Sequence, residues 1–290
     1  MPTYRPNNGR HENGQNYLVN DATIRKVVGL VHRDDGDDRV DRDDRGDTVE
    51  IGPGHGALTF PLQDRVLRGG GGGSLTVVEI DPDNVRWLEQ RLDPAVHIVE
   101  QDFLEFLLPD SPYRIVGNLP FHLTTAMLRR VLHAPGWTDA VVITQWEVAR
   151  RRAGVGGATM MTAQWWPWIT FDLHGRVPAG HFRPRPTVDG GVLVMSRRRE
   201  PLLDVRDRAR YRAFVHGVFT GKGHGIRQIL VHASRRRGPG GIRGRGVRDV
   251  QDALREAGVP DAALPKELDA TQWVSLFTTL CGRGPRMRID

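Results

Sequence analysis

The chain has 290 residues, of which 39% are hydrophobic, and it carries a formal net charge of +6 at pH 7 with a pI of about 10.0. Such a length suits one medium domain plus a small second one, and the basic balance favours a polyanionic partner. The lone cysteine, Cys281, excludes an intramolecular disulfide and a cysteine-rich zinc site. We see no signal peptide and no apolar run of the roughly 20 residues that a membrane span needs, so we expect a soluble, cytoplasmic protein without a membrane partner.

The N-terminal region predicts one helix between two polar segments. Residues 1–13 are polar and are expected to form a flexible tail. A helix is predicted over 22–32, with Asp21 as its cap, because apolar residues recur there at helical spacing. Residues 32–47 are almost entirely Asp, Arg and Gly and predict a solvated loop, since they offer nothing to bury. A metal site among these aspartates is disfavoured, because arginines interleave with them and the spacing is not that of an EF-hand.

From residue 48 onward, short apolar strands alternate with helical segments. Such alternation predicts an α/β fold in which a mostly parallel sheet is covered by helices on both faces. Two later strands, 169–177 and 190–198, are expected to close the sheet as an antiparallel pair. The other expected strands are 48–52, 75–81, 96–102, 113–118 and 139–146, and the helices between them are about 57–67, 82–92 and 122–134.

After Arg199 the strands stop and only helical patterns follow. We therefore expect three parts: the flexible tail 1–13, a catalytic domain over 14–199, and a small helical domain over 200–290. Between two of its helices lies a basic, glycine-rich stretch, 235–246, that could contact nucleic acid. The predicted helices are about 206–219, 225–234, 248–257 and 271–281.

The first strand of the sheet runs into a glycine-rich turn, Glu50–Gly56. Glycines such as Gly52 and Gly54 let the backbone approach a ligand, and the next helix presents free N–H groups. The spacing lacks the third glycine of a dinucleotide fingerprint, and there is no Lys-Ser/Thr of a phosphate-binding loop. The alternative, a tight turn with a purely structural role, stays open at this point.

Carboxylates follow the second and third strands. Glu79 is placed to accept hydrogen bonds from ribose hydroxyls, whereas Asp81 could do so or could cap the next helix. Asp102 is placed to accept from an adenine amino group, although a lone strand-end aspartate is more often a cap. Because the carboxyl ends of parallel strands meet at one edge, these groups together fit an adenosine-bearing cofactor.

The fourth strand ends in Asn118-Leu119-Pro120-Phe121. The lone pair of an aryl amine is delocalised into its ring, so acceptors that take the amine protons make the nitrogen more nucleophilic. The Asn118 side-chain oxygen and the Leu119 carbonyl can act as such acceptors, because Pro120 holds the turn and has no N–H to compete. Phe121 can stack on a base. The motif is typical of methyl transfer to the amine of a nucleobase, and no metal is needed.

In this order, these motifs resemble the rRNA adenine N6-methyltransferases, which comprise the Erm antibiotic-resistance enzymes and the small-subunit dimethyladenosine transferases. The resemblance is strong over about 14–200 and weak in the tail. It implies a Rossmann-like class I methyltransferase fold with S-adenosyl-L-methionine as cofactor. Residues 14–18 look like the family's N-terminal motif, and 181–189 resemble its FxPxPxVDS segment. The cofactor-site residues that the resemblance implies are Gln15, Asn16, Leu18, Gly52, Gly54, Glu79, Ile80, Asp102, Phe103 and Asn118.

Five features depart from the family pattern. Tyr17 replaces the usual Phe, Phe121 stands where Tyr is commoner, and Gly190 replaces a small polar residue. The acidic loop and the glycine run 69–73 look like insertions. None of these changes removes a proposed catalytic atom.

Within the family, residues 144–151, Trp166-Pro167 and 197–203 look more like the Erm branch. This branch implies methylation of one adenine of 23S rRNA and resistance to macrolides, lincosamides and streptogramin B, by a monomer. The alternatives are a 16S rRNA dimethyladenosine transferase, a non-catalytic RNA-binding protein on the same fold, and a nicotinamide dehydrogenase. The last is disfavoured by the glycine spacing.

Two further groups of residues have two interpretations each. Trp146, Trp165, Trp166 and Trp168 could stack on RNA, although aromatic residues after a strand are more often core. The runs 150–152 and 235–237 are basic and could grip phosphates or form a solvated face. The eleven histidines show no metal-ligand spacing, so we assign no metal site.

Overall fold

The structure, a computed structural model, describes residues 16–31, 46–68, 73–234, 242 and 246–282. The predicted tail 1–13, most of the acidic loop, the run 235–237 and the cofactor candidate Gln15 lie outside the described residues. The chain divides into two compact units. The first comprises Met1–Trp146 and Gly175–Val192, and the second comprises Glu147–His174 and Leu193–Asp290. The predicted domain boundary after residue 199 stays a prediction.

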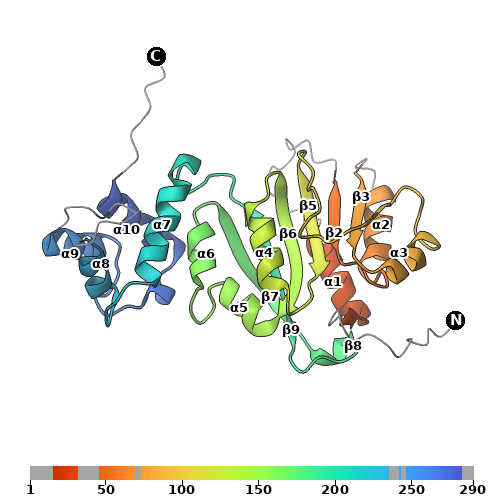
Figure 1. Cartoon of the computed structure of the whole chain (residues 1–290). Helices are drawn as coiled ribbons and strands as arrows, with labels where there is room; N and C mark the ends of the chain where they lie inside the picture. The colour runs from red at the N-terminus through yellow and green to blue at the C-terminus, as the bar shows by residue number, and fades with distance from the viewer. Residues whose placement is uncertain (1–15, 32–45, 69–72, 235–241, 243–245, 283–290) are drawn as a thin grey trace, which may run out of the picture. The chain divides into compact units, whose positions relative to one another are not determined.

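A seven-stranded sheet carries the fold, with the strand order β4-β3-β2-β5-β6-β9-β7 (Figure 1). Its first five strands pair in parallel, as the alternating pattern predicted. Helices α1, α2 and α3 pack against these strands, and α4 contacts β6 through the hydrogen bond from Trp137 Nε1–H to the Val131 carbonyl. The chain passes from β4 to β5 without a helix between them, in a segment that the structure describes throughout. The strands are β2 (Thr48–Ile51), β3 (Leu75–Glu79), β4 (His97–Glu100), β5 (Tyr113–Asn118), β6 (Trp137–Gln145), β7 (Ile169–Val177) and β9 (Gly190–Arg197).

Among the predicted strands, β2, β3 and β5 are mostly buried, whereas β4 at the edge of the sheet is not. All four residues of β2 are buried, including the polar Thr48 and Glu50. In β5 the central Ile115 and Val116 are fully buried. Continuous burial is the expected pattern for parallel strands inside an α/β fold. The parallel pairing of β2 with β3 and β5 brings the carboxyl ends of all three strands to one edge of the sheet.

The helices α1 and α3 begin at polar side-chain caps, and the cap of α1 differs from the prediction. The helix α1 (Asp21–Val31) starts at Asp21, but Asn20 is the residue whose side chain accepts from the Thr23 N–H at 3.0 Å. The predicted cap at Asp21 was therefore wrong by one residue. The helix α2 (Thr59–Arg68) holds Pro61 in its first turn, where the missing N–H costs nothing. The helix α4 (Thr124–His133) follows β5.

Asp81 is a helix cap, as one of the two interpretations proposed. It precedes α3 (Pro82–Glu89) and accepts a hydrogen bond from the Asp83 N–H at 2.8 Å. The capping side chain satisfies one of the free N–H groups at the start of the helix. This role leaves Glu79, the last residue of β3, as the carboxylate that is available at the end of the strand.

The sequence interpretation missed four short elements. Trp146, which was expected to end a strand, begins the helix α5 (Trp146–Arg152), and α6 (Met160–Trp165) follows it. A two-stranded sheet joins β1 (Tyr17–Leu18) to β8 (Phe182–Arg183) in antiparallel register, so that Leu18 lies opposite Phe182. These elements are too short to show a periodic pattern. The short 3-10 turn η3 (Ala179–His181) precedes β8.

The second unit contains the four helices that were predicted after Arg199. Its core is aromatic: Tyr211 and Phe214 pack edge-on against Phe277 and Trp273. No described helix has the length and apolar character that crossing a membrane requires. The helices are α7 (Arg208–Phe219), α8 (Ile226–Ser234), α9 (Val247–Glu256) and α10 (Ala270–Cys281), with 3-10 turns η4 (Val205–Asp207) and η5 (Pro265–Glu267).

Candidate active site

The Asn118–Phe121 turn begins at the last residue of β5 and is held by the neighbouring strand and helix. The Leu119 N–H donates to the Ile143 carbonyl of β6 at 2.9 Å. The Pro120 carbonyl accepts from the Leu123 N–H at 3.0 Å, just before α4. Both ends of the turn are therefore fixed by backbone hydrogen bonds, and the turn is preorganised before any ligand arrives.

The Asn118 side chain has one defined orientation. Its Nδ2 donates to the Asn16 carbonyl oxygen at 2.7 Å. Only the NH2 end of an amide can donate, so this bond assigns the nitrogen to the Asn16 side and turns Oδ1 the other way. Asn16, from the N-terminal motif, therefore binds the nitrogen of the Asn118 amide, and the amide oxygen is left as an oriented acceptor.

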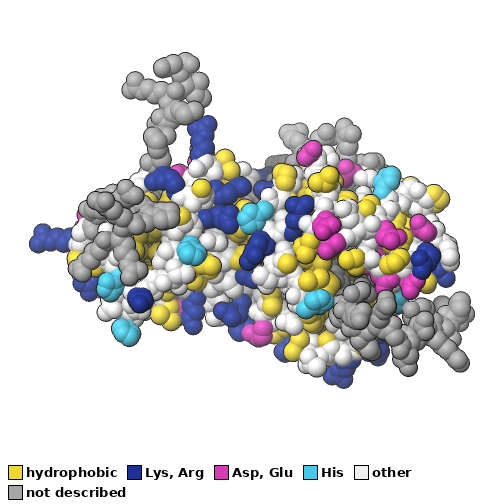
Figure 2. Space-filling view, viewed as in Figure 1, with side chains coloured by type: hydrophobic (Ala, Val, Ile, Leu, Met, Phe, Trp, Pro, Cys, Tyr) yellow, Lys and Arg dark blue, Asp and Glu magenta, His cyan; other side chains and the backbone are white. Residues whose placement is uncertain are grey.

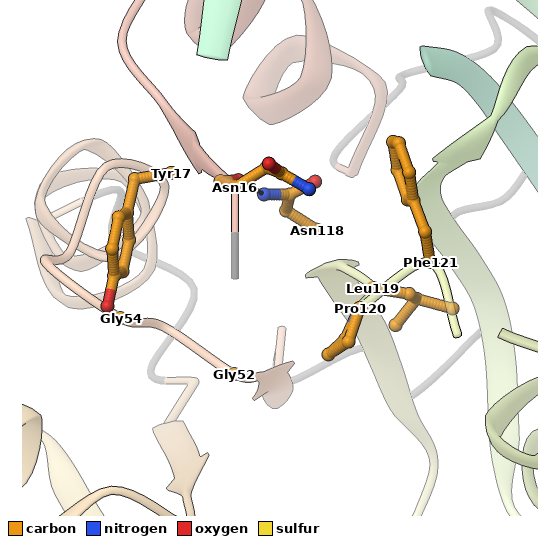
Figure 3. Close-up of a pocket in the computed structure, with 8 residues that line it drawn as sticks. All are labelled: Asn16, Tyr17, Gly52, Gly54, Asn118, Leu119, Pro120 and Phe121. Atoms are coloured by element: carbon orange, nitrogen blue, oxygen red, sulfur yellow. Dashed lines mark hydrogen bonds between the residues drawn. The ribbon is translucent and has the colours of Figure 1, made fainter. Parts of the chain in front are cut away.

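A pocket surrounds this amide in the first unit. Figure 3 shows the rings of Tyr17 and Phe121 on opposite sides of it, with Asn16 and Asn118 between them. Three separate stretches of sequence, near residues 16, 52 and 118, meet there. The lining residues are Asn16, Tyr17, Gly52, Gly54, Asn118, Leu119, Pro120 and Phe121.

The glycine turn after β2 brings backbone to the pocket in a conformation that favours glycine. Gly52 has a φ of 61° and Gly54 a φ of 54°. A Cβ built on Gly52 would meet nothing within 4 Å, so open space faces this residue. A Cβ on Gly54 would stand 2.6 Å from Tyr17 Cε1. The turn therefore needs glycine at 54 because the Tyr17 ring covers it, and at 52 because of the backbone conformation.

Glu79 is buried and its carboxylate organises the same turn. Oε2 accepts from the Gly54 N–H, and Oε1 accepts from the N–H groups of Ile80 and Asp81, each at 2.9 Å. Burial raises the pKa of Glu79 above its usual value, and these three hydrogen bonds oppose the rise. A carboxylate offers about four acceptor positions, so one is left for a ligand hydroxyl.

A second buried acid, Glu50 of β2, was part of the glycine motif but had no assigned role. Burial raises the pKa of Glu50 to about 8, with the nearby Thr59 hydroxyl opposing this rise and the charge of Glu79 adding to it. Glu50 Oε2 lies without a hydrogen-bond partner in the described part of the chain. Glu50 is therefore mostly protonated at neutral pH.

The remaining cofactor candidates lie around this edge of the sheet but outside the lining set of the pocket. Asp102 follows β4 by two residues, and its Oδ1 accepts from the Leu104 N–H at 2.8 Å. Phe103 and Leu18 are buried, whereas Ile80 is 54% exposed. Asp102 thus makes the local turn contact that a strand-end aspartate usually makes, and its role toward a ligand stays a prediction.

The structure adds three aromatic contacts that the sequence did not predict. Phe182 packs edge-on to Phe121, with ring centroids 6.3 Å apart. The Tyr17 ring stacks on the His55 ring, with the ring centroids 4.2 Å apart and the ring planes at 5° to each other. The His55 ring in turn contacts Trp87. The two pocket walls are therefore supported by rings from residues far away in sequence. The only sequence signal was that Tyr17, His55 and Phe182 lie inside the family motifs.

A parallel sheet with a glycine turn after β2, a buried acid at the end of β3 and an oriented amide at the end of β5 defines a class I methyltransferase. The residues fit S-adenosyl-L-methionine, because Gly52 faces open space and Glu79 keeps an acceptor position for a ribose hydroxyl.

Comparison with known proteins identifies the family. Residues 6–250 match the family described as ribosomal RNA adenine dimethylase, and the chain belongs to it. An rRNA adenine N-6-methyltransferase of Corynebacterium diphtheriae is 50% identical over 223 residues, which cover 77% of this chain and 82% of that protein. The mycinamicin-resistance protein MyrB of Micromonospora griseorubida is 40% identical over 93% of this chain and 78% of its own length.

Among solved structures, the crystal structure of the 23S rRNA methyltransferase ErmE has a TM-score of 0.78 and 31% identity, covering 91% of this chain and 99% of that chain. This match confirms the predicted fold class. The chain is an S-adenosyl-L-methionine-dependent rRNA adenine N6-methyltransferase of the Erm type, as the motifs predicted.

Proposed function

We propose that the chain methylates N6 of one adenine in 23S rRNA and thereby confers resistance to macrolides, lincosamides and streptogramin B. Two similarities support this choice of substrate. One relative is named for mycinamicin resistance, and the ErmE structure is that of a 23S rRNA methyltransferase. The observation that carries the chemistry is the Asn118 amide, whose nitrogen is held by Asn16 so that its oxygen is free to accept.

In this proposal Asn118 Oδ1 and the Leu119 carbonyl accept hydrogen bonds from the target amine. Both acceptors draw the nitrogen toward a pyramidal geometry, which frees its lone pair for attack. S-adenosyl-L-methionine supplies an electrophilic methyl group on a sulfonium sulfur. Because the acceptors are fixed by the turn, positioning supplies most of the rate enhancement. Pro120 keeps the turn rigid without offering an N–H that would compete for the acceptors.

Phe121 is the proposed stacking surface for the adenine. It lies across the pocket from Tyr17 and is supported edge-on by Phe182 (Figure 3). A base inside a folded RNA is reached only after it is unstacked and rotated out, so we propose that the target adenine is flipped into this pocket. Stacking on Phe121 would repay part of the cost of unstacking.

The other predicted residues have roles in cofactor binding in this proposal. Glu79 accepts from a ribose hydroxyl, and Asp102 accepts from the adenine amino group of the cofactor. The glycine turn lets the backbone approach the ligand. The remaining cofactor-binding residues in the proposal are Gln15, Asn16, Leu18, Gly52, Gly54, Ile80, Phe103 and Asn118. We further propose that the protein acts as a cytoplasmic monomer.

The test is methyl transfer from labelled S-adenosyl-L-methionine to protein-free 23S rRNA and, separately, to 16S rRNA and small-subunit particles. Label on a single 23S adenine, mapped by primer extension and weighed by mass spectrometry, is the expected result. Label restricted to small-subunit material would move the chain to the dimethyladenosine-transferase branch. If neither RNA is labelled while the cofactor binds, the catalytic proposal fails and a non-catalytic RNA-binding role replaces it.

A further inference from the structure

The helix α7 in the second unit carries arginines in two different situations. Arg210 is paired: it contacts Asp207 at 2.9 Å and donates to the Cys281 carbonyl at 2.9 Å. Arg208 and Arg212, one turn apart on the same helix, contact no carboxylate and no hydrogen-bond acceptor among the described residues. Their Nε atoms are buried and without a partner in the described part of the chain, whereas the terminal NH2 groups of both guanidiniums are not buried. A buried donor without an acceptor is costly, so these two arginines call for an explanation.

Both guanidinium groups lie over buried tryptophan rings. Arg208 Cζ is 5.3 Å from the Trp165 ring centroid and 5.4 Å from that of Trp168, and Arg212 Cζ is 5.3 Å from Trp165. The indoles themselves are only 2% and 4% exposed. The rings are therefore part of the core, as one interpretation of the sequence proposed, and are not free to stack on a base.

The Trp165 and Trp168 rings beneath the two arginines belong to a segment that hydrogen bonds hold in place. The Trp168 Nε1–H donates to the Leu203 carbonyl at 2.8 Å, and the Tyr211 hydroxyl donates to the Ala163 carbonyl at 3.0 Å. Gln164 Nε2 donates to the Arg212 carbonyl at 3.1 Å. The last two bonds tie α6 to α7, and the first ties the loop after α6 to the segment before η4. The rings beneath the guanidinium groups therefore form a rigid base, and the arginines lose little freedom on binding a ligand.

The two positive charges are close enough to oppose each other. Burial lowers the pKa of the Arg212 guanidinium, and the charge of Arg208 lowers it further. Placing like charges together in a half-buried site is unfavourable unless an anion joins them. Figure 2 shows dark-blue side chains gathered over the region where Figure 1 labels α6 and α7.

We propose that Arg208 and Arg212 form a two-arginine site for one phosphodiester of the RNA substrate, with Trp165 and Trp168 as its floor. Each planar guanidinium can offer two parallel N–H groups to phosphate oxygens, which suits a single phosphate between them. The site positions RNA and takes no part in the chemical step. The inference rests on the proposed function, because that function supplies the polyanion.

The test compares the double variant R208Q/R212Q with R255Q. Arg255 lies on α9, is exposed and pairs with Asp252, so R255Q controls for the loss of a positive charge. Binding of protein-free 23S rRNA is measured at several salt concentrations. The double variant is expected to bind about tenfold more weakly, and its slope of log affinity against log salt should be shallower by about one phosphate contact. The single variants should each show most of this loss, since they share one phosphate.

The kinetic readout separates RNA binding from chemistry. In R208Q/R212Q the KM for RNA should rise while kcat at saturating RNA and the affinity for S-adenosyl-L-methionine stay at wild-type values. R255Q should match the wild type in all these measurements. A folded double variant with wild-type RNA affinity, or with weaker affinity and an unchanged salt slope, would overturn the proposal.

A measurement on the unmodified protein covers the case in which the double variant does not fold. Phenylglyoxal modifies accessible arginines, and peptide mass mapping reports each position. Arg208 and Arg212 should be protected by 23S rRNA and not by S-adenosyl-L-methionine, while Arg255 reacts equally in all samples. Equal reaction of Arg208 and Arg212 with and without RNA refutes the site. If the wild type labels only small-subunit RNA, the 23S proposal fails, and the same footprint with that RNA still tests the site.

Discussion

The pocket in the first unit and the arginine pair on α7 satisfy their polar groups in opposite ways. In the first unit, the amide nitrogen of Asn118 in the pocket and the carboxylate of Glu79 beneath the glycine turn are already held by backbone partners. On α7, the Nε atoms of Arg208 and Arg212 have no described partner. We relate the difference to the proposed ligands: a small cofactor and a single base need a few acceptors aimed in advance, whereas an RNA phosphate can itself accept from the terminal N–H groups of the two arginines.

The largest effect is expected for Asn118→Ala, which changes the pocket and leaves the arginine pair intact. Loss of the oriented acceptor should lower the rate of methyl transfer by about 10²–10³-fold, the usual effect of removing one preorganised hydrogen-bonding group. The affinity for RNA should stay unchanged, because the phosphate contacts are elsewhere. Single-turnover transfer and RNA binding are measured on the same preparation. Unchanged turnover would remove Asn118 from the mechanism.

A smaller effect is expected for Glu79→Ala. The substitution removes the acceptor for three backbone N–H groups as well as the proposed ribose contact, so the Kd for S-adenosyl-L-methionine should rise by roughly 10–100-fold. Isothermal titration calorimetry measures this affinity. The matched control is Glu50→Gln, which replaces a mostly protonated buried acid by a neutral amide of the same shape and should leave cofactor binding close to the wild type. An unaltered isotherm for Glu79→Ala would contradict the assignment.

The raised pKa of the buried Glu50 predicts that the stability of the protein depends on pH. Burial raises the pKa of Glu50 from 4.5 to about 8. Between these values the folded state binds more protons than the unfolded state, so this contribution to stability is full below about pH 4.5 and is lost as pH rises through 8. Glu50→Gln should remove this pH dependence. Between pH 6 and pH 8 the wild type should lose about 2 kcal/mol of unfolding free energy that the variant keeps. Urea unfolding at several pH values measures the difference, and parallel curves for the two proteins would contradict it.

The smallest expected effect concerns the glycine turn. Gly54→Ala places a Cβ 2.6 Å from Tyr17 Cε1 at a φ of 54°, so it should destabilise the protein by about 1–2 kcal/mol and weaken cofactor binding. Gly29→Ala is the control, because a Cβ there meets nothing within 4 Å inside helix α1. It should be neutral or stabilise by about 0.5–1 kcal/mol. Thermal unfolding compares the two variants, and equal melting temperatures would show that Tyr17 moves aside.

Much of the catalytic unit could be predicted because its signals are local. The apolar run that ends at Asn118 predicted β5 with the bounds that the structure has, whereas the strand predicted over 75–81 ends two residues earlier, at Glu79. What the sequence could not predict are bonds between distant residues: Asn118 to Asn16, Glu79 to Gly54, and β1 to β8. The arginine pair was missed for the same reason, since α6 shows no periodic pattern and only packing places Trp165 beneath Arg208 and Arg212.

The β1–β8 pairing has a consequence for how the enzyme is made. Tyr17 lies opposite Arg183 and Leu18 opposite Phe182, so this wall of the pocket joins the start of the chain to a segment that the ribosome synthesises much later. Contacts of such large sequence separation form slowly, because closing the long intervening loop costs entropy. During translation β1 is synthesised before β8 and stays unpaired until β8 has been made. A nascent chain that has not yet released residue 183 from the exit tunnel cannot close its own site.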